Sequence, residues 1–338
     1  MRMLSGHVDM THGGGGRATA DLIRNLFHRH LGNAFLNQGH DAALLPAQGG
    51  RLVMSTDGHV IAPLFFPGGD IGSLSVHGSL NDVAMAGARP LYLTAGFILE
   101  EGFPLADLER IVISMANAAR DAGVPVVAGD TKVVEKGKAD GVFITTTGLG
   151  VVPDGVDIGP HRVRPGQAIL ISGTIGDHGV AILSKREALD FETDILSDSA
   201  ALHGLVADMV AAVPGIAMLR DPTRGGLATA LNEIAAHARV GMMLDEAAIP
   251  IRPGVKGACE LLGLDPLYVA NEGKLVCFCE ANDASTLLGV MRGQPLGRDA
   301  AQIGVVTEDE TGMVQMKTGF GGIRVVDWLA GEQLPRIC

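Results

Sequence analysis

Acidic side chains recur at the ends of apolar segments in the first half of the chain. Asp57 and Asp130 each follow an apolar segment, and Asp41 lies in a turn that precedes another. Asp82 lies within residues 71–88, whose small and apolar residues have helical spacing and predict a buried helix. A carboxylate at the end of a strand lies at the rim of its sheet. The pattern therefore favours a layered fold that brings these carboxylates together.

Four neighbouring carboxylates would repel one another unless divalent cations lay between them. Each aspartate alone is more simply explained as a turn or cap residue, but the four together favour a metal site. The net charge of -12 argues against nucleic acids and anionic membranes as partners. A phosphate-bearing substrate of so acidic a protein needs a metal ion, and magnesium is the natural candidate.

Strand and helix patterns alternate along the chain. In the first half the order is strand, strand, helix, strand, helix, strand, strand, which predicts an α+β domain with helices on one face of a mixed sheet. A second α/β domain begins with a strand at residue 168, after a segment rich in Pro, Gly and Asp. The expected divisions are a Gly-rich segment and helix (1–35), an N-terminal domain (36–152), a linker (153–166), a C-terminal domain (167–326) and a mobile tail (327–338).

Two segments of the second half contain candidate site residues. In residues 220–235, an aspartate, a proline turn and a glycine pair precede a predicted helix. Free N–H groups at a helix start bind anions, and Arg224 beside Asp221 adds a fork for oxygen atoms. An N-cap with a solvated arginine is the alternative. Glu272 lies in the turn 271–274 before an apolar strand, and an ordinary turn would have the same pattern.

A run of four glycines, residues 13–16, precedes residues 17–27, which have helical spacing. The glycines offer backbone N–H groups to an anion, and a flexible N-terminal loop explains them equally well. No charged segment followed by an apolar run opens the chain, and no apolar stretch reaches the roughly 20 residues of a membrane span. A soluble cytoplasmic protein is expected.

The four cysteines have different surroundings. Cys277 and Cys279 alternate in an apolar strand, so they are expected to be buried on one face, and Cys259 is also expected to be structural. A zinc site is not expected, because no second Cys or His pair has matching spacing. Cys338 ends the chain after Pro335, and a thiol on so short and stiff a tether can reach a partner. A chance terminal cysteine is the alternative.

Several motifs carry a resemblance to a known family. They are Ser55-Thr56-Asp57-Gly58, Asn81-Asp82-Val83-Ala84-Met85-Ala86-Gly87-Ala88, Gly129-Asp130-Thr131-Lys132-Val133 and Asp221-Pro222-Thr223-Arg224-Gly225-Gly226-Leu227. They resemble the ATP-dependent family that includes aminoimidazole ribonucleotide synthetase, selenophosphate synthetase and thiamine monophosphate kinase. Within it, residues 12–16, residues 65–72 and the final Pro335-Arg336-Ile337-Cys338 resemble the carbamoyl dehydratases of hydrogenase maturation. The family often has paired acids where this chain has His40-Asp41, which predicts a weaker metal contact or a water there.

The resemblance implies a fold and a cofactor site. The fold is two α/β domains of the aminoimidazole ribonucleotide synthetase type, with the N-terminal sheet forming a barrel across a homodimer. A homodimer is also expected because an exposed mixed sheet needs its edges and apolar face covered. ATP would lie in the cleft between the domains, with magnesium bound by Asp41, Asp57, Asp82, Asp130 and Asp221. The nucleotide site would also include Asn81, Thr131 and Arg224.

The resemblance also implies a reaction. A carbamoyl group on Cys338 is a thiocarbamate, and its dehydration to a thiocyanate requires phosphorylation of the oxygen and removal of both N–H protons. Lys132 would stabilise the transferring phosphoryl group, and Glu272 is the candidate base. A carbamoyltransferase would load Cys338 from carbamoyl phosphate, and an iron-carrying complex would accept cyanide for a NiFe-hydrogenase.

Two other functions remain open. One is an ATP-dependent kinase or synthetase that acts on a free small molecule, with an incidental tail. The other is a nucleotide-binding scaffold for a maturation complex. A kinase would turn over its substrate without Cys338, and a scaffold would not couple ATP hydrolysis to a loaded tail.

Overall fold

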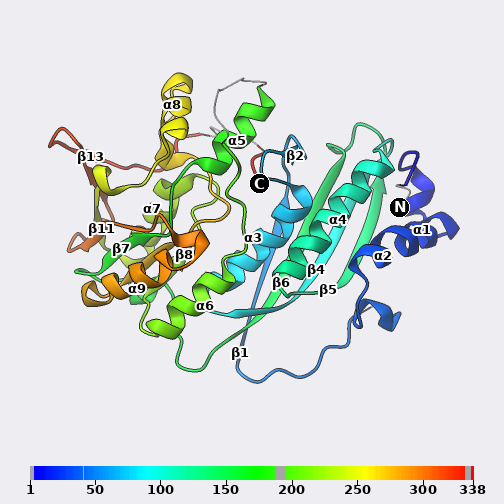
Figure 1. Ribbon diagram of the computed structural model, residues 1–338, viewed down its shortest axis with the longest axis horizontal. Coiled ribbons are helices and arrows are strands. Elements are labelled where there is room, and N and C mark those ends of the chain that lie inside the picture. The colour runs from blue at the N-terminus through cyan, green and yellow to red at the C-terminus, as the bar shows by residue number, and fades with distance from the viewer. Residues whose placement is uncertain (1–3, 41, 188–194, 332–335) are drawn as a thin grey trace.

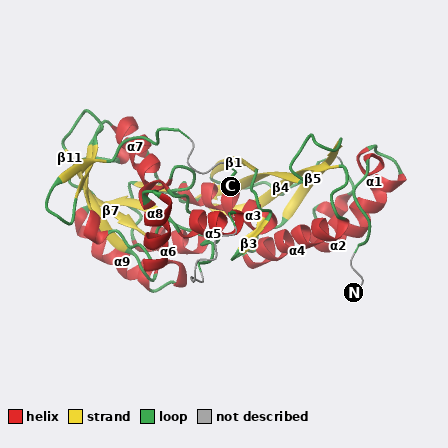
Figure 2. Ribbon diagram, turned by 90° about the horizontal axis from the view of Figure 1, so that it is seen from above, coloured by secondary structure: helices red, strands yellow, loops and turns green. Residues whose placement is uncertain are grey.

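The computed structural model describes residues 4–40, 42–187, 195–331 and 336–338, which form two halves lying side by side (Figure 1). Each half contains a sheet with helices packed on it, so the expected two-domain α+β organisation is confirmed. The end of the chain lies between the two halves, next to α5 (Asp177–Arg186), in both Figure 1 and Figure 2.

A four-stranded mixed sheet forms the centre of the N-terminal half. Its strand order is β1-β6-β4-β5, with β4 parallel to β5 and β6 antiparallel to both of its neighbours. The strands are β1 (Arg51–His59), β4 (Arg89–Glu100), β5 (Val126–Val134) and β6 (Val142–Val152). A separate small hairpin consists of β2 (Phe65–Phe66) and β3 (Gly69–Asp70).

Helices α3 (Ile71–Met85) and α4 (Leu105–Asp121) pack together on one face of this sheet. Asp70 begins α3, because its Oδ1 accepts the N–H of Gly72 at 2.7 Å. α3 consists largely of small and apolar residues, and nearly all of its sides are buried. It packs against β1 and β6 as well as α4. The predicted buried helix and the predicted helix layer on one face of the sheet are both confirmed. Leu52 and Met54 of β1 are exposed.

Residues 17–31 form a continuous helical segment beside α4 and β5 (Figure 1). It comprises α1 (Arg17–Leu22), a π-helical turn (Ile23–Phe27) and α2 (His28–Leu31). The helix predicted over residues 17–27 is confirmed and continues for one further turn, with Leu26 fully buried.

The sequence predicts a strand after Asp41, and this prediction is wrong for the residues that the structure describes. Residues 43–49 have no regular structure, and Leu44 is 69% exposed. The side chain of Gln38 bonds both the N–H and the C=O of Leu44, at 2.8 and 3.0 Å, so these groups are paired without a neighbouring strand.

The C-terminal half contains a seven-stranded sheet with the order β13-β12-β9-β11-β7-β10-β8. Only the β12–β9 pair is parallel among the pairs that the structure describes. The strands are β7 (Ala168–Ile171), β8 (Met218–Arg220), β9 (Gly241–Asp245), β10 (Val276–Cys279), β11 (Ala301–Thr307), β12 (Val314–Lys317) and β13 (Ile323–Val325). The remaining helices are α6 (His203–Ala212), α7 (Gly226–Ala238), α8 (Pro253–Leu262) and α9 (Ala284–Arg292).

Alternation along β10 divides the core of this half into two layers. Cys277 and Cys279 face the layer that contains α6 and α9, whereas Val276 and Phe278 face the layer that contains α7. Both cysteines are fully buried, as predicted, and Cys259 is buried in α8.

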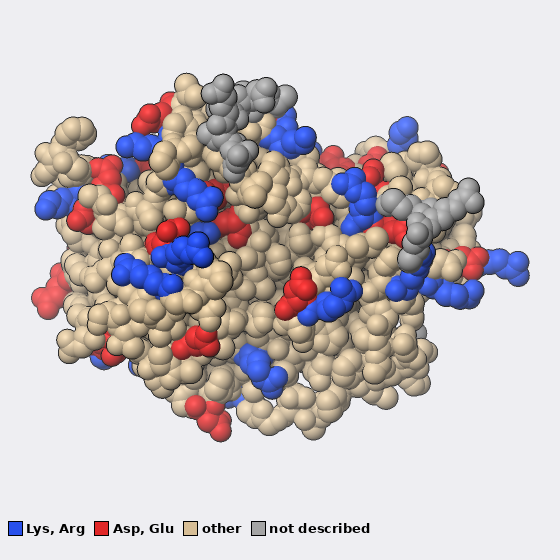
Figure 3. Space-filling view, in the orientation of Figure 1, with Lys and Arg blue, Asp and Glu red and all other residues tan. Residues whose placement is uncertain are grey.

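Apolar residues from both halves share one cluster, in which Val83 and Met85 of α3 pack with residues of α6 and β7. The contact positions the C-terminal half beside the end of β1. Among the described residues, no helix is both long and apolar enough to cross a bilayer. Basic and acidic side chains are interspersed on the face drawn in Figure 3.

Candidate functional site

The last three residues of the chain are docked against the segment that follows β1. The N–H of Val60 donates to the C=O of Cys338 at 3.0 Å, and the N–H of Ala62 donates to the C=O of Arg336 at 3.3 Å. Ile337 bridges to Ile61 in an antiparallel pair, and its side chain is 2% exposed. The described end of the tail therefore pairs with backbone.

This docking partly buries Cys338 among charged side chains. Arg224, Glu272 and Asp57 all lie close enough to the sulfur to interact with it electrostatically. Burial, followed by the charge of Glu272, raises the pKa of Cys338 to about 12, although Arg224 opposes the rise. Burial and neighbouring negative charge therefore keep the docked thiol protonated near neutral pH.

Glu272 is a buried carboxyl group in the turn before β10. Its side chain is 3% exposed, and Oε1 has no hydrogen-bond partner among the described residues. Burial and then the charges of Asp221 and Asp198 raise its pKa well above the ordinary value. The group carries a proton while its neighbours stay uncompensated, and balancing their charge would lower its pKa so that the carboxylate forms near neutral pH.

Asp57, Asp82 and Asp221 lie close enough together that the charges of Asp82 and Asp57 raise the pKa of Asp221 and the charge of Asp57 raises that of Asp82. We name these three residues the acidic cleft. Burial and then the charge of Asp82 raise the pKa of Asp221 to about 7, and burial also raises the pKa of Asp82. Ser55 Oγ donates to Asp82 at 2.6 Å. Asp221 comes from the end of β8, while Asp57 and Asp82 come from β1 and α3, so the cleft joins the two halves.

The acidic cleft fits a hydrated magnesium ion that also binds phosphate. Among the described residues, no three His, Cys, Asp or Glu side chains are gathered closely enough to hold a metal alone. Mg²⁺ usually binds one or two carboxylates, several waters and substrate phosphates. The raised pKa values of Asp221 and Asp82 indicate an uncompensated negative charge that such a cation would balance.

Without divalent cations, we expect the free energy of unfolding to fall as the pH rises from about 4 to about 7. Asp221 has a folded pKa of about 7 against an ordinary value of 3.8, so the folded state binds its proton more tightly. The contribution of Asp221 to the free energy of unfolding is fully present below the unfolded pKa, and it is lost as the pH rises through the folded pKa. The total loss is roughly 4 kcal/mol. Urea unfolding at several pH values measures it.

Asp221→Asn should flatten this pH dependence, and added magnesium should stabilise the wild-type protein at pH 7. Asp154→Asn, which alters an exposed carboxylate, is the control and should retain the wild-type slope. An unchanged slope in Asp221→Asn would contradict the burial argument.

Asn81 joins the two halves through its side chain. Its Nδ2 donates to the C=O of Ala200 at 3.0 Å and to the C=O of Glu272 at 3.3 Å, and its Oδ1 accepts the N–H of Leu202 at 2.8 Å. Its amide therefore holds the Glu272 turn against α3, and the expected contact of Asn81 with the nucleotide stays a prediction.

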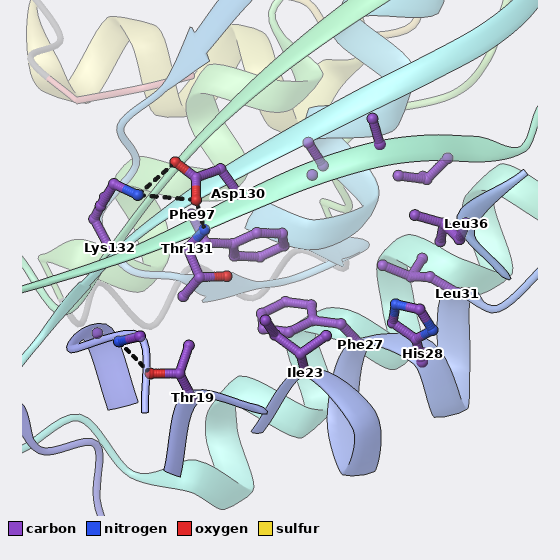
Figure 4. A pocket seen from close by; sticks show the side chains of 16 residues that line it. Thr19, Ile23, Phe27, His28, Leu31, Leu36, Phe97, Asp130, Thr131 and Lys132 are labelled. Atoms are coloured by element: carbon purple, nitrogen blue, oxygen red, sulfur yellow. Dashed lines mark hydrogen bonds and ion pairs between the residues drawn. The ribbon is translucent and has the colours of Figure 1, made fainter. Parts of the chain in front are cut away.

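A second pocket lies between the N-terminal helical segment and the sheet. We name this cavity of about 260 Å³ the N-terminal pocket. Ile23, Phe27 and Leu31 form an apolar side, while Asp130, Thr131 and Lys132 from β5 form a polar end (Figure 4). Gly13 and Gly15 also line it, so the glycine run lies beside the polar end.

The structure does not bring Asp130 beside the acidic cleft within one chain. Asp57 pairs with Thr146, Thr146 with Ala95, and Ala95 with Gly129, so Asp130 lies about three strand spacings away, roughly 14 Å. β5 also continues to Val134, so Asp130 is within the strand and not at its end. Four carboxylates therefore do not form one cluster inside a single chain.

Lys132 pairs with Asp130 at 2.8 Å and is mainly exposed. In the part of the chain described, none of its contacts reaches Cys338, so a role in phosphoryl transfer would have to be exerted at the N-terminal pocket. The N–H of Thr131 donates to Asp130 Oδ1 at 2.8 Å. Asp41 lies outside the described residues.

The turn before α7 requires its two glycines. Gly225 and Gly226 have φ values of 80° and 64°. A side chain at Gly226 would meet the C=O of Leu267 at 2.5 Å, so the turn lies directly on the segment before Asn271. This turn places Arg224, the predicted anion-binding residue, where its charge acts on the Cys338 sulfur.

Comparison with known proteins identifies the family. Models of the AIR synthase related protein match residues 39–152 with their N-terminal domain and residues 164–317 with their C-terminal domain. Carbamoyl dehydratase HypE of Cupriavidus necator is 69% identical over the full chain and 97% of that protein. The chain belongs to the carbamoyl dehydratase HypE family.

Two solved HypE structures match closely. Hydrogenase maturation protein HypE in complex with ATP has 51% identity and a TM-score of 0.94, covering 97% of this chain and 99% of that one. The HypE chain of a HypE–HypF complex has 47% identity and a TM-score of 0.81, covering 91% and 99%. The expected resemblance to carbamoyl dehydratases is therefore confirmed.

Sequence analysis missed the apolar side of the N-terminal pocket in this HypE family member. Ile23, Phe27 and Leu31 recur every four residues, and this spacing predicted a helix but not what the helix faces. Their position opposite Phe97 depends on how the helix packs on the sheet, and the rings of Phe27 and Phe97 are 5.0 Å apart.

Proposed function

We propose that the protein uses ATP to dehydrate a carbamoyl group carried on the sulfur of Cys338, and that the resulting thiocyanate supplies cyanide to a hydrogenase iron. The observation that carries this proposal is the docked terminal thiol, which lies between Arg224 and the buried carboxyl of Glu272. A kinase acting on a free small molecule gives no reason for the protein's own thiol to occupy this cleft.

The proposed reaction balances as two linked steps. The carbamoyl oxygen attacks the γ-phosphorus of ATP and ADP leaves. The C–O bond then breaks, phosphate departs with that oxygen, and loss of both N–H protons leaves a C≡N group on sulfur. The sum is thiocarbamate plus ATP giving thiocyanate, ADP and phosphate. No electrons are exchanged with an outside donor or acceptor.

Glu272 is the proposed base for at least one N–H proton. Uncompensated charge on Asp221 and Asp198 keeps Glu272 protonated, and balancing the charge in the cleft would lower its pKa and free its carboxylate to accept the proton. Magnesium bound by Asp57, Asp82 and Asp221 would supply that balance and would polarise the phosphate. Arg224 would keep the sulfur, and therefore its load, beside the base.

The N-terminal pocket is the proposed place for the nucleotide. Its apolar side suits a base, and the glycines with Thr131 and Lys132 suit phosphates. Because the sheet separates this pocket from the acidic cleft of the same chain, we infer that a homodimer assembles each complete site from two chains. The uncovered sheet face, where Leu52 and Met54 are exposed, is the proposed contact, and residues 43–49, which lie outside any strand, would extend a shared barrel.

Met54→Lys is expected to give a monomer and to lose ATP-dependent dehydration. Met54 is 71% exposed on the uncovered face, and a charge there opposes burial against a second chain. Light scattering at micromolar concentration measures the change. Leu261→Lys, at a residue 78% exposed on α8, is the matched control and should remain dimeric. A monomeric wild-type protein would overturn the shared site.

A carbamoyltransferase of the HypF type is the proposed loading partner, and an iron-carrying complex is the proposed acceptor of cyanide. A reducing compartment such as the cytoplasm would keep Cys338 free for loading. The direct test is the intact mass of the protein after incubation with carbamoyl phosphate, that partner and ATP. We expect a carbamoyl adduct without ATP and the same adduct less one water with ATP. A carbamoyl adduct that ATP leaves unchanged would reject dehydration.

A further inference from the structure

We propose that His178 and Arg186, at the two ends of α5, are positioning residues that hold the tail in its docked position by its backbone carbonyls. Because the tail carries the reacting group, the consequence for catalysis rests on the proposed function. The docking itself does not depend on it. We name these two side chains the α5 clamp.

His178 is a fully buried donor to the tail. Its Nε2 lies 2.7 Å from the C=O of Ile337, and its Nδ1 lies 2.8 Å from Ser197 Oγ. A carbonyl only accepts, so Nε2 carries the proton and Nδ1 accepts the hydroxyl of Ser197. Burial lowers the pKa of His178 and keeps the ring neutral. Phe66 packs edge-on against the ring, which fixes its orientation.

Arg186 joins the tail to the segment that it pairs with. Its Nε and Nη2 donate to the C=O of Ala62 at 2.9 and 2.8 Å, and Nη2 also donates to the C=O of Arg336 at 2.8 Å. The α5 clamp therefore bonds two successive tail carbonyls, one at each end of the helix. The guanidinium fork also fixes the position of Ala62, whose N–H bonds Arg336.

Recognition of carbonyls suits a carrier whose load changes. The sulfur of Cys338 would be free, carbamoylated and cyanated in turn, whereas the carbonyls of Arg336 and Ile337 remain the same. Hydrogen bonds to the backbone therefore hold the tail in every state. The sulfur and its load remain accessible to Arg224 and Glu272. Arg336 has a φ of 54°, an uncommon conformation for this residue type, so the docked backbone depends on such external bonds.

The first test is the rate at which iodoacetamide alkylates Cys338, without ATP or a partner. Cys338 is partly buried when the tail is docked, and its raised pKa disfavours the reactive thiolate, so faster alkylation reports undocking. We expect at least roughly tenfold faster alkylation in His178→Ala and in Arg186→Ala, since a lost bond to a charged or buried partner shifts an equilibrium by about that factor. Peptide mapping confirms the modified residue.

Conservative and neighbouring variants separate positioning from a general loss of structure. His178→Gln and Arg186→Lys retain a donor, so their alkylation rates should fall between the wild-type and alanine values. Lys185→Ala changes an exposed residue next to Arg186 that has no described bond to the tail, and it should behave as wild type. If the alanine variants unfold, the two conservative variants alone decide the outcome. Wild-type alkylation rates throughout would overturn the α5 clamp.

The second test uses the carbamoylated protein in a single turnover with ATP. The α5 clamp variants should load normally and dehydrate at least roughly tenfold more slowly, because the load visits the cleft less often. A wild-type protein that loads but never dehydrates would reject the proposed function, and faster alkylation in the variants would still support the clamp. Faster alkylation with an unchanged dehydration rate would overturn the role of the clamp in the reaction.

Discussion

Cys338→Ala is expected to abolish both carbamoyl loading and thiocyanate formation. The sulfur is the atom that bears the load, so the loss should be complete. The fold should be retained, because Ile337 still fills its buried site and the backbone bonds of Val60 and Ala62 do not involve the thiol. Intact mass measures the adducts, and calorimetry measures ATP binding, which should stay near the wild-type value.

Cys259→Ala is the matched control, because it removes a thiol that is buried in α8, away from the cleft. It should load and dehydrate like the wild type, with some loss of stability. An adduct on Cys259, Cys277 or Cys279 in the Cys338→Ala protein would contradict the assignment of Cys338 as the carrier.

Glu272→Gln is expected to slow dehydration by roughly a hundredfold to ten-thousandfold, the usual contribution of a general base. Glutamine keeps the shape of the side chain but cannot accept the proton. Loading should not change, because it occurs on the tail before dehydration. Stability without magnesium should not fall, since the raised pKa means that the buried group is already neutral. Single-turnover kinetics of the carbamoylated protein measure the effect.

Glu233→Gln provides the comparison. Glu233 is an exposed residue of α7 that pairs with Arg220 at 2.7 Å, so its loss should change dehydration little. The wild-type rate should also rise with pH as Glu272 loses its proton, and this rise should be absent in Glu272→Gln. A variant that dehydrates at the wild-type rate would exclude Glu272 as the base.

The sequence alone determined the local elements and several site residues. Alternation in residues 276–279 predicted two buried cysteines on one face, and the small and apolar residues 71–88 predicted a buried helix that carries Asp82. These predictions succeed because a strand period of two and a helix period of 3.6 fix which residues share a face. The motifs and the terminal cysteine indicated the family because they are local features that can be recognised in short stretches of sequence.

Tertiary structure decided which of these residues meet. Asp130 and Asp57 look equivalent in sequence, but three strand spacings separate them because β6 and β4 lie between β1 and β5. The side chain of Asn81 in α3 hydrogen-bonds the C=O of Ala200 in the other half of the molecule. His178 hydrogen-bonds a carbonyl 159 residues further along the chain. The proton affinities of Glu272 and Cys338 also required the structure, since burial and neighbouring charge set them and neither is encoded in nearby residues.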